Sequence, residues 1–470
     1  MKKVCALLLI ALLAAPLLAQ VETDARSLVL KNVSVIEMTG APPKNGLTVV
    51  VKGNRIAAVG GAGKVRGPKN AQVIDAGGKY LIPGLWDMHV HLFNNVAGSG
   101  TNNKDIYFPL FIANGVTGVR DMFTDADDIK LVREWQAEIE AGRLIGPRIA
   151  PGSAIVDGVP TFLPNLLGVA TPDEARAAVR KLKADGAGFI KIYWNLKPEV
   201  YRAIADEAKK LGIDFAGHVP FSMSAGEVSD AGQKSIEHLT GILESCSSKE
   251  EELRIAKMSP AALAEELWKT NDEKKCRELF RRFAKNRTWH TPTAVLHRAN
   301  LLSEEDYIKK DERLRYIAPD DRQDWVKRAN QPRKLALQTR QLRFEKMLST
   351  IHTMFRTGVP LLAGTDVGNP FVIAGFSLHD ELEMFVQAGL SPMEALKTAT
   401  VSPAEYLGRL KDFGTVEKGK IADLVLLEAN PLEEIGNTRK IAAVIVNGKY
   451  LPKADLQKML AGVETSLNRQ

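Results

Sequence analysis

The chain of 470 residues has only three cysteines and, beyond its first twenty residues, no long apolar run, internal repeat or low-complexity segment. Without long apolar runs it cannot be a protein that crosses a membrane several times. Its apolar and charged fractions, 45% and 25%, are ordinary for a folded protein and exclude bulk disorder. The length fits one barrel-sized domain with additions.

A concentrated basic face is also missing. The formal net charge is +7, but Lys and Arg are spread along the chain, and the denser stretch Arg313–Arg343 carries acidic residues as well. We interpret that stretch as a solvated helical surface. Nucleic acid is therefore not an expected partner, since its binding would need clustered positive charge. Whether the chain forms a homo-oligomer is left open.

The N-terminus has the pattern of a secretory signal peptide. Lys2 and Lys3 precede an apolar run from Val4 to Ala19, which is shorter than the roughly 20 residues of a spanning helix. We predict a signal peptide over residues 1–19 and a periplasmic or secreted protein with no membrane span after its removal. Cys246 and Cys276 then remain, and the sequence allows either a disulfide or two separate thiols.

Both ends of the remaining chain are rich in strand patterns. Alternating runs occur at Leu28–Val35 and Gln72–Asp75 near the start, and at Asp423–Leu427 and Ala442–Val446 near the end. Asn447-Gly448 is typical of a hairpin turn. We predict one small β-sandwich domain formed by residues 20–80 and 414–470.

Residues 81–413 alternate short apolar runs with helical patterns. Eight strands that alternate with helices indicate an α/β fold, a (β/α)₈ TIM barrel, rather than an open sheet. A long charged stretch, about Leu296–Phe355, precedes the eighth run, and a connection of that length usually has structure of its own or forms a lid. The eight runs are Leu85–His91, Val116–Asp121, Pro147–Pro151, Phe189–Trp194, Phe215–Val219, Ser235–Leu239, Thr288–Pro292 and Pro360–Asp366.

The first of these runs contains His89 and His91. Residues two apart on a strand share a face, so both imidazoles can point at one metal ion. A His-x-His pair alone is weak evidence, because such pairs are common in cores and on surfaces.

Four more polar residues stand at strand ends. They are Lys191 in the fourth run, His218 in the fifth, His238 in the sixth and Asp366 in the eighth. All strand C-termini of a barrel open on one face, where active sites lie, so these side chains should converge with the histidine pair. Each could separately be structural, but their joint placement favours a metal site.

Three longer motifs carry a family resemblance. The segments Tyr80–His91, Gly115–Asp121 and Gly414–Val425 resemble the metal-dependent amidohydrolase superfamily, in the branch similar to imidazolonepropionase and to Xaa-Pro or Xaa-Arg dipeptidases. The resemblance covers nearly the whole chain after the predicted signal peptide. It specifies the superfamily and says little about the substrate.

The resemblance implies a role for each candidate residue. His89, His91 and Asp366 would hold a buried metal ion, and His218 and His238 a more exposed one. Lys191 would bridge both as a CO₂-derived carbamate, since an ammonium group has no lone pair to give. The two divalent ions are expected to be Zn²⁺, although these ligands suit other metals. Asp366 would also be catalytic, as the general base and then the general acid towards a metal-activated hydroxide.

Tyr193 and His290 are tentative substrate-binding residues, with packing as the alternative for both. Arg120 and Asp121 could form an internal salt bridge that shapes the site or could contact substrate. We expect an exported hydrolase that cleaves the amide bond of a small-molecule or peptide substrate, a dipeptide or an N-acyl amino acid. The alternatives are a cyclic amidase, lactonase or phosphotriesterase on the same metals, and a catalytically silent binding protein.

Overall fold

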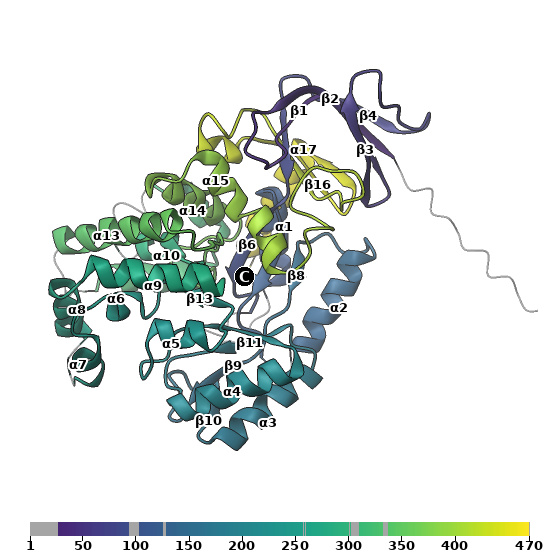
Figure 1. Ribbon diagram of the computed structural model, residues 1–470. Helices are drawn as coiled ribbons and strands as arrows, with labels where there is room; N and C mark the ends of the chain where they lie inside the picture. Colours follow the sequence, from purple (N-terminus) through teal and green to yellow (C-terminus); the bar gives the residue numbers. More distant parts are fainter. Residues whose placement is uncertain are drawn as a thin grey trace, which may run out of the picture.

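A computed structural model describes residues 27–93, 103–125, 128–256, 258, 260–299, 301, 310–331 and 337–469. Its strands form three sheets, one built from both ends of the chain and two from the middle. Figure 1 shows the first sheet above the middle segments, with the early strands β1 to β4 near the late strand β16. The predicted signal peptide lies outside the described residues.

The sheet made from both ends has eight strands, in the order β17-β16-β15-β5-β1-β2-β3, with β4 also paired to β1. Its alternating apolar side chains, such as Leu30, Val49 and Leu424, fill a core of their own. Asn447 and Gly448 both have positive φ, 50° and 78°, as a two-residue hairpin requires. The strands are β1 (Leu28–Val35), β2 (Lys44–Lys52), β3 (Arg55–Gly61), β4 (Gln72–Asp75), β5 (Tyr80–Pro83), β15 (Leu424–Leu427), β16 (Ile441–Val446) and β17 (Lys449–Pro452).

The middle of the chain forms two parallel sheets. Three strands follow the order β6-β7-β8 and six the order β10-β9-β11-β12-β13-β14. The sequence interpretation missed β9 and β10, whose runs are short. The strands are β6 (Leu85–Val90), β7 (Val116–Asp121), β8 (Arg148–Ala150), β9 (Ile155–Gly158), β10 (Leu167–Val169), β11 (Phe189–Ile192), β12 (Asp214–Gly217), β13 (Ser235–Glu237) and β14 (Trp289–Thr291).

The eighth predicted run, Pro360–Asp366, lies between β14 and β6 but is not a regular strand. Isolated parallel bridges join Leu361 to His290 and Val367 to Val90. Backbone bonds of 2.9 Å from Leu362 to His290 and from Met88 to Ala363 hold it there. The segment thus lies between β14, an edge strand of the six-stranded sheet, and β6, an edge strand of the three-stranded sheet. It places Asp366 next to β6.

Helices cover the outside of these strands. In α4 (Pro198–Leu211), proline fits the first turn, Gly212 ends the helix at φ 61°, and Val200, Tyr201 and Ile204 bury one face. The other helices are α1 (Lys104–Ala113), α2 (Ile129–Glu140), α3 (Pro172–Ala184), α5 (Ala225–Asp230), α14 (Phe376–Gln387), α15 (Pro392–Thr398), α16 (Val401–Tyr406), η2 (Ile435–Arg439) and α17 (Lys453–Leu467).

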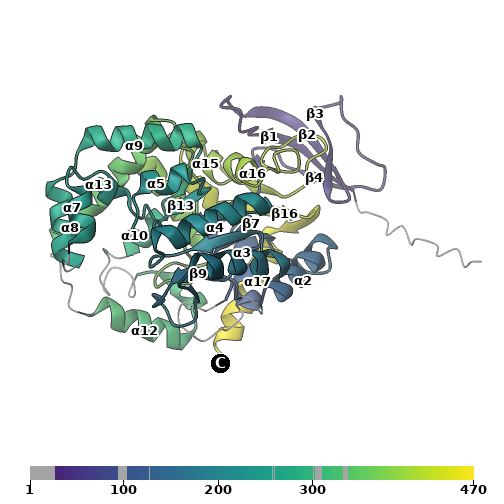
Figure 2. The same cartoon turned by 60° about the horizontal axis from the view of Figure 1, so that its bottom comes forward.

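Two helical segments, one before β14 and one after it, lie on one side of the molecule (Figures 1 and 2). The disulfide Cys246–Cys276, which the sequence left open, joins the end of α6 to α9. The first segment has α6 (Ile242–Ser245), α7 (Glu250–Ile255), α8 (Pro260–Lys269) and α9 (Glu273–Asn286); the second has α10 (Ala294–Ala299), η1 (Glu312–Tyr316), α12 (Pro319–Ala329) and α13 (Leu337–Arg356). The second is the long charged stretch, and it does have structure of its own. Within the described residues, no helix is both long and apolar enough to span a bilayer.

Candidate metal centre

The histidine pair lies at the end of β6, where His89 is fully buried and His91, directly after the strand, is 6% exposed. Asp366 contacts both rings: its Oδ1 lies 2.8 Å from Nε2 of His91 and 3.3 Å from Nε2 of His89. The three side chains form a group whose ligand atoms all lie within 4.8 Å of one another. This compact cluster of two imidazoles and a carboxylate has the composition of a divalent-metal site.

His238 reaches Asp366 from the other side. Its Nε2 lies 3.8 Å from Oδ2 of Asp366, and its ring is 4.4 Å from that of His89. His238 and Asp366 both have left-handed backbone conformations, with φ of 59° and 64°. Residues with a side chain seldom adopt this conformation, and such strain concentrates at functional sites.

His218 follows β12, and its ring lies 5.1 Å from that of His238. The rings of Tyr193 and Trp194 lie 4.3 Å from it on the other side. Gly217 comes directly before it at φ 142°, where a Cβ would lie 2.2 Å from the carbonyl oxygen of Ile192. Only glycine lets the chain pass β11 this closely, so it sets the position of His218.

Lys191 lies on β11 and is only 1% exposed. Burial lowers the pKa of its amine to about 8, although the carboxylates of Glu237 and Asp366 oppose this shift. An amine with such a pKa is partly unprotonated near neutral pH, so it is more nucleophilic than an ordinary lysine. Its charge also acts on the pKa values of His218 and His238, so Lys191 lies near these histidines and Asp366. The roles of the six residues as metal ligands or as their bridge remain a prediction.

The electrostatics match a site for cations. Burial alone would raise the pKa of Asp366, but the neighbouring His238 and His89 hold it well below its usual range. Burial also keeps the pKa values of His218 and His238 well below the ordinary histidine value. Neutral imidazoles and an ionised carboxylate are the forms that bind metals.

Glu237, which the sequence interpretation did not single out, fixes the ring of His89. Its Oε2 accepts a hydrogen bond from Nδ1 of His89 at 2.8 Å, and both its oxygens accept bonds from the Arg120 guanidinium at 2.9 Å. Burial would raise the pKa of Glu237, but Arg120 holds it well below its usual range. With Nδ1 protonated in this way, the lone pair of His89 is on Nε2, as a metal ligand needs. That buried atom makes no hydrogen bond within the described residues.

His238 is oriented in the same manner by Thr293. The Thr293 hydroxyl donates to the carbonyl oxygen of Pro292 at 2.8 Å, so it accepts the bond of 2.8 Å from Nδ1 of His238. The ring therefore also presents its Nε2 lone pair to Asp366. In both His89 and His238, Nδ1 bonds to another side chain and Nε2 keeps its lone pair. This arrangement is the one that histidine ligands of a metal ion have.

Asp87 ties the pair on β6 to the Asp366 segment. Its Oδ1 accepts bonds from the backbone N–H groups of His89 at 3.2 Å and Thr365 at 3.0 Å, and its Oδ2 accepts one from the Thr365 hydroxyl at 2.6 Å. Burial raises the pKa of Asp87 to about 7. A charged residue within an apolar strand run is the sequence signal that could have marked Asp87, which stands in the run Leu85–Val90.

Of the two tentative substrate residues, only Tyr193 lies in this group, beside His218. His290 packs against Phe283 of α9, with 4.6 Å between ring centroids. Thr291, next along β14, instead accepts a bond from Arg120 at 3.2 Å, which places the two side chains on opposite faces of the strand. Arg120 forms the internal salt bridge that was one of its two alternatives.

The sequence pattern of the amidohydrolase family matches residues 80–451, most of the chain. The chain belongs to the amidohydrolase family. This membership confirms the resemblance drawn from the motifs and the enzyme class, a hydrolase of carbon–nitrogen bonds. It also confirms the fold, a TIM barrel with a β-sandwich domain, although the strand ladders of the parallel sheets do not close into one continuous ring. The domain limits remain a prediction.

Known proteins similar to the chain agree with this family. An imidazolonepropionase of Shouchella clausii is 31% identical over 128 residues, which are 24% of this chain and only 27% of that enzyme. A solved structure described as a prolidase from Bifidobacterium longum is 25% identical, covers 94% of this chain and 99% of its own, and has a TM-score of 0.67. A bottromycin amidohydrolase, 22% identical over 94% of this chain and 91% of its own, has a TM-score of 0.75 and shares the fold.

Proposed function

We propose that the protein is an exported, binuclear metal-dependent hydrolase that cleaves the amide bond of a dipeptide or an N-acyl amino acid. The observation that carries the proposal is the orientation of the site histidines. Glu237 and Thr293 hold Nδ1 of His89 and His238, and both Nε2 atoms face Asp366. The prolidase-like and amidohydrolase neighbours support the amide-bond substrate.

His89, His91 and Asp366 would hold one divalent ion, and His218 and His238 a second, with Zn²⁺ the metal that suits these ligands. Lys191 would lie between them as a carbamate, which its unusually low pKa of about 8 supports. When bound, such ions supply Lewis acidity and make hydroxide available near neutral pH. The carboxylate of Asp366 would take the proton of the attacking water and return it to the leaving nitrogen.

Metal analysis and a lysine variant test the proposal. We expect about two zinc ions per chain in the purified protein, and the Lys191→Ala variant to lose turnover and metal together because the bridging group is gone. Lys234→Ala is the matched control, since this lysine makes an exposed salt bridge with Asp214. Full activity in Lys191→Ala would contradict the bridge, and a protein that stays metal-free after supplementation would favour a silent binding protein.

The substrate class needs its own assay. A screen with dipeptides, N-acyl amino acids, lactones and phosphotriesters should give turnover with the first two classes. Turnover confined to lactones or phosphotriesters would overturn the amide-bond proposal while leaving the metal centre intact.

Export is supported by the disulfide Cys246–Cys276, because such bonds persist in oxidising compartments. Fractionation of cells that express the full chain should place the protein outside the cytoplasm with its first residues removed. Full-length protein confined to the cytoplasm would contradict export.

A further inference from the structure

A pocket of about 230 Å³ lies beside His238. It is enclosed by the chain that follows β13 and by side chains of α6, α8, α10 and α13. Figures 1 and 2 both show α8 near α13 at one side of the molecule. Because His238 lines the pocket and also lies 3.8 Å from Asp366, anything bound there would sit next to the candidate metal centre.

The pocket wall is mainly apolar. A cavity of roughly 150 Å³ with apolar walls is enough to hold benzene, so this one has room for a phenyl or branched aliphatic group and more. Leu243 is 37% exposed, although its side chain is large and apolar. The apolar side chains are Leu239, Ile242, Leu243, Trp268 and Met347.

Two cations, Arg343 and Lys346, also line the pocket, and its lining among the described residues includes no Asp or Glu. They stand three residues apart on α13 and therefore share a face of the helix. Within the part of the chain that the structure describes, neither side chain forms a salt bridge, and Arg343 only contributes to lowering the pKa of Glu265. Two positive charges that no salt bridge within the described residues neutralises favour an anionic ligand at this apolar pocket.

We propose that this pocket binds the part of the substrate that carries both a free carboxylate and a large apolar side chain. Arg343 and Lys346 would bind the carboxylate, and Trp268 and Met347 would contact the side chain. The inference rests on the proposed function and narrows it to peptides or N-acyl derivatives of large apolar amino acids. Amides without a carboxylate, or derivatives of glycine, should be poor substrates.

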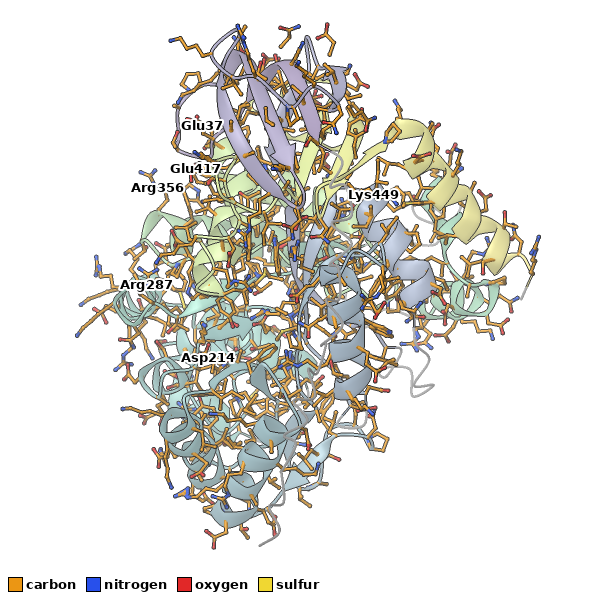
Figure 3. All side chains as sticks on the ribbon, turned by 90° about the vertical axis from the view of Figure 1, so that its right-hand side faces the viewer. Glu37, Asp214, Arg287, Arg356, Glu417 and Lys449 are labelled. Atoms are coloured by element: carbon orange, nitrogen blue, oxygen red, sulfur yellow. A yellow bond between two sulfur atoms is a disulfide. The ribbon has the colours of Figure 1, made fainter. Side chains whose placement is uncertain are left out.

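Binding of two probes that cannot be hydrolysed in the assay tests the charged half of the proposal. Calorimetry on the metal-loaded protein should show tighter binding of 3-phenylpropionate than of the neutral 3-phenylpropan-1-ol, which has no amide bond. The double variant Arg343→Gln/Lys346→Gln should weaken binding of the carboxylate probe about tenfold, as expected for loss of charge-assisted bonds, and leave binding of the alcohol unchanged. Arg356→Gln is the control, because this residue lies on the same helix at the outer surface and does not line the pocket (Figure 3).

Leu243→Ala tests the apolar half, since it removes pocket wall from a partly exposed position. It should weaken both probes about threefold by loss of buried apolar area. In kinetics, kcat/KM for N-acetyl-L-phenylalanine should exceed that for its amide and for N-acetylglycine, and the double variant should remove the preference over the amide.

The outcomes separate this inference from the proposed function. Equal binding of both probes, or unchanged binding in the double variant, would overturn the pocket assignment even if the enzyme hydrolyses amides. Binding that follows these expectations in a protein without hydrolase activity would keep the pocket and reject the proposed function.

Discussion

His89 lies on β6 and His91 is one residue past its end, whereas His218 and His238 each follow a different strand, β12 and β13. Strand alternation alone puts the first pair on one face. The second pair depends on Gly217 and on the left-handed φ of His238, which a strand pattern does not contain. We call His89 and His91 the first half of the site and His218 and His238 the second half. Secondary structure fixes the first half, and local backbone geometry fixes the second.

The groups that orient the two halves differ as well. His89 is held by the buried, ionised Glu237, itself paired with Arg120, while His238 is held by the neutral hydroxyl of Thr293. A charged, buried partner binds more strongly and costs more when removed than a neutral one. Variants of Glu237 should therefore lose more activity and more stability than variants of Thr293.

The largest effect should come from Asp366, which contacts both halves. In Asp366→Asn the carboxylate charge beside three imidazoles is lost, so activity should fall at least about a thousandfold and bound metal should fall with it. Asp157→Asn is the control, because this buried carboxylate accepts bonds from the backbone N–H groups of Phe162 and Asn195 and is not a predicted metal ligand. Metal content and kcat/KM measure the outcome; near-normal activity would remove Asp366 from its proposed role.

Replacing Glu237, which orients His89 in the first half, should cause the second-largest loss of activity. Glu237→Gln leaves Arg120 buried without its countercharge and His89 without an ionic partner. We expect activity to fall about 10- to 100-fold, and the free energy of unfolding to fall by about 3 kcal/mol.

Glu207→Gln is the control for this prediction, since Glu207 of α4 is buried and paired with Arg180 of α3. It should change stability with little effect on kcat/KM. If Glu237→Gln kept full activity and metal, the orientation of His89 would not depend on this carboxylate.

The same comparison shows which features of the fold and of the site could be predicted from the sequence. The strand pattern predicted the parallel α/β core, and it predicted that His89, His91 and Asp366 would lie close together, as they do. The full set of six metal-binding residues remains a prediction. Glu237 and Thr293 were not predicted, because their importance depends on which ring nitrogen they face, and this becomes visible only in three dimensions. The Pro360–Asp366 run was predicted as a strand, but only isolated bridges hold it, since the chain turns to a left-handed conformation at Asp366.

The pocket beside His238 is a second feature that could not be predicted from the sequence. Its lining comes from the chain after β13 and from α6, α8, α10 and α13, which are spread over more than a hundred residues. The charged stretch around Arg313–Arg343 was interpreted as a solvated surface, and most of its charges are exposed or paired with neighbouring acids. Only tertiary packing brings Arg343 to an apolar wall, so no local pattern could have distinguished it from the other basic residues.

The smallest effect should follow from weakening the second half of the site. Thr293→Val removes the hydroxyl that orients His238 but no charge, so activity should fall only roughly fivefold and the free energy of unfolding by about 1 kcal/mol. Thr288→Val removes a comparable buried bond, to Ser229 at 2.7 Å, away from the site. Both variants should lose similar stability, measured by chemical unfolding, while only Thr293→Val loses activity. If it lost as much activity as Glu237→Gln, the halves would be equally dependent on their supports, and the distinction between an ionic and a neutral anchor would fail.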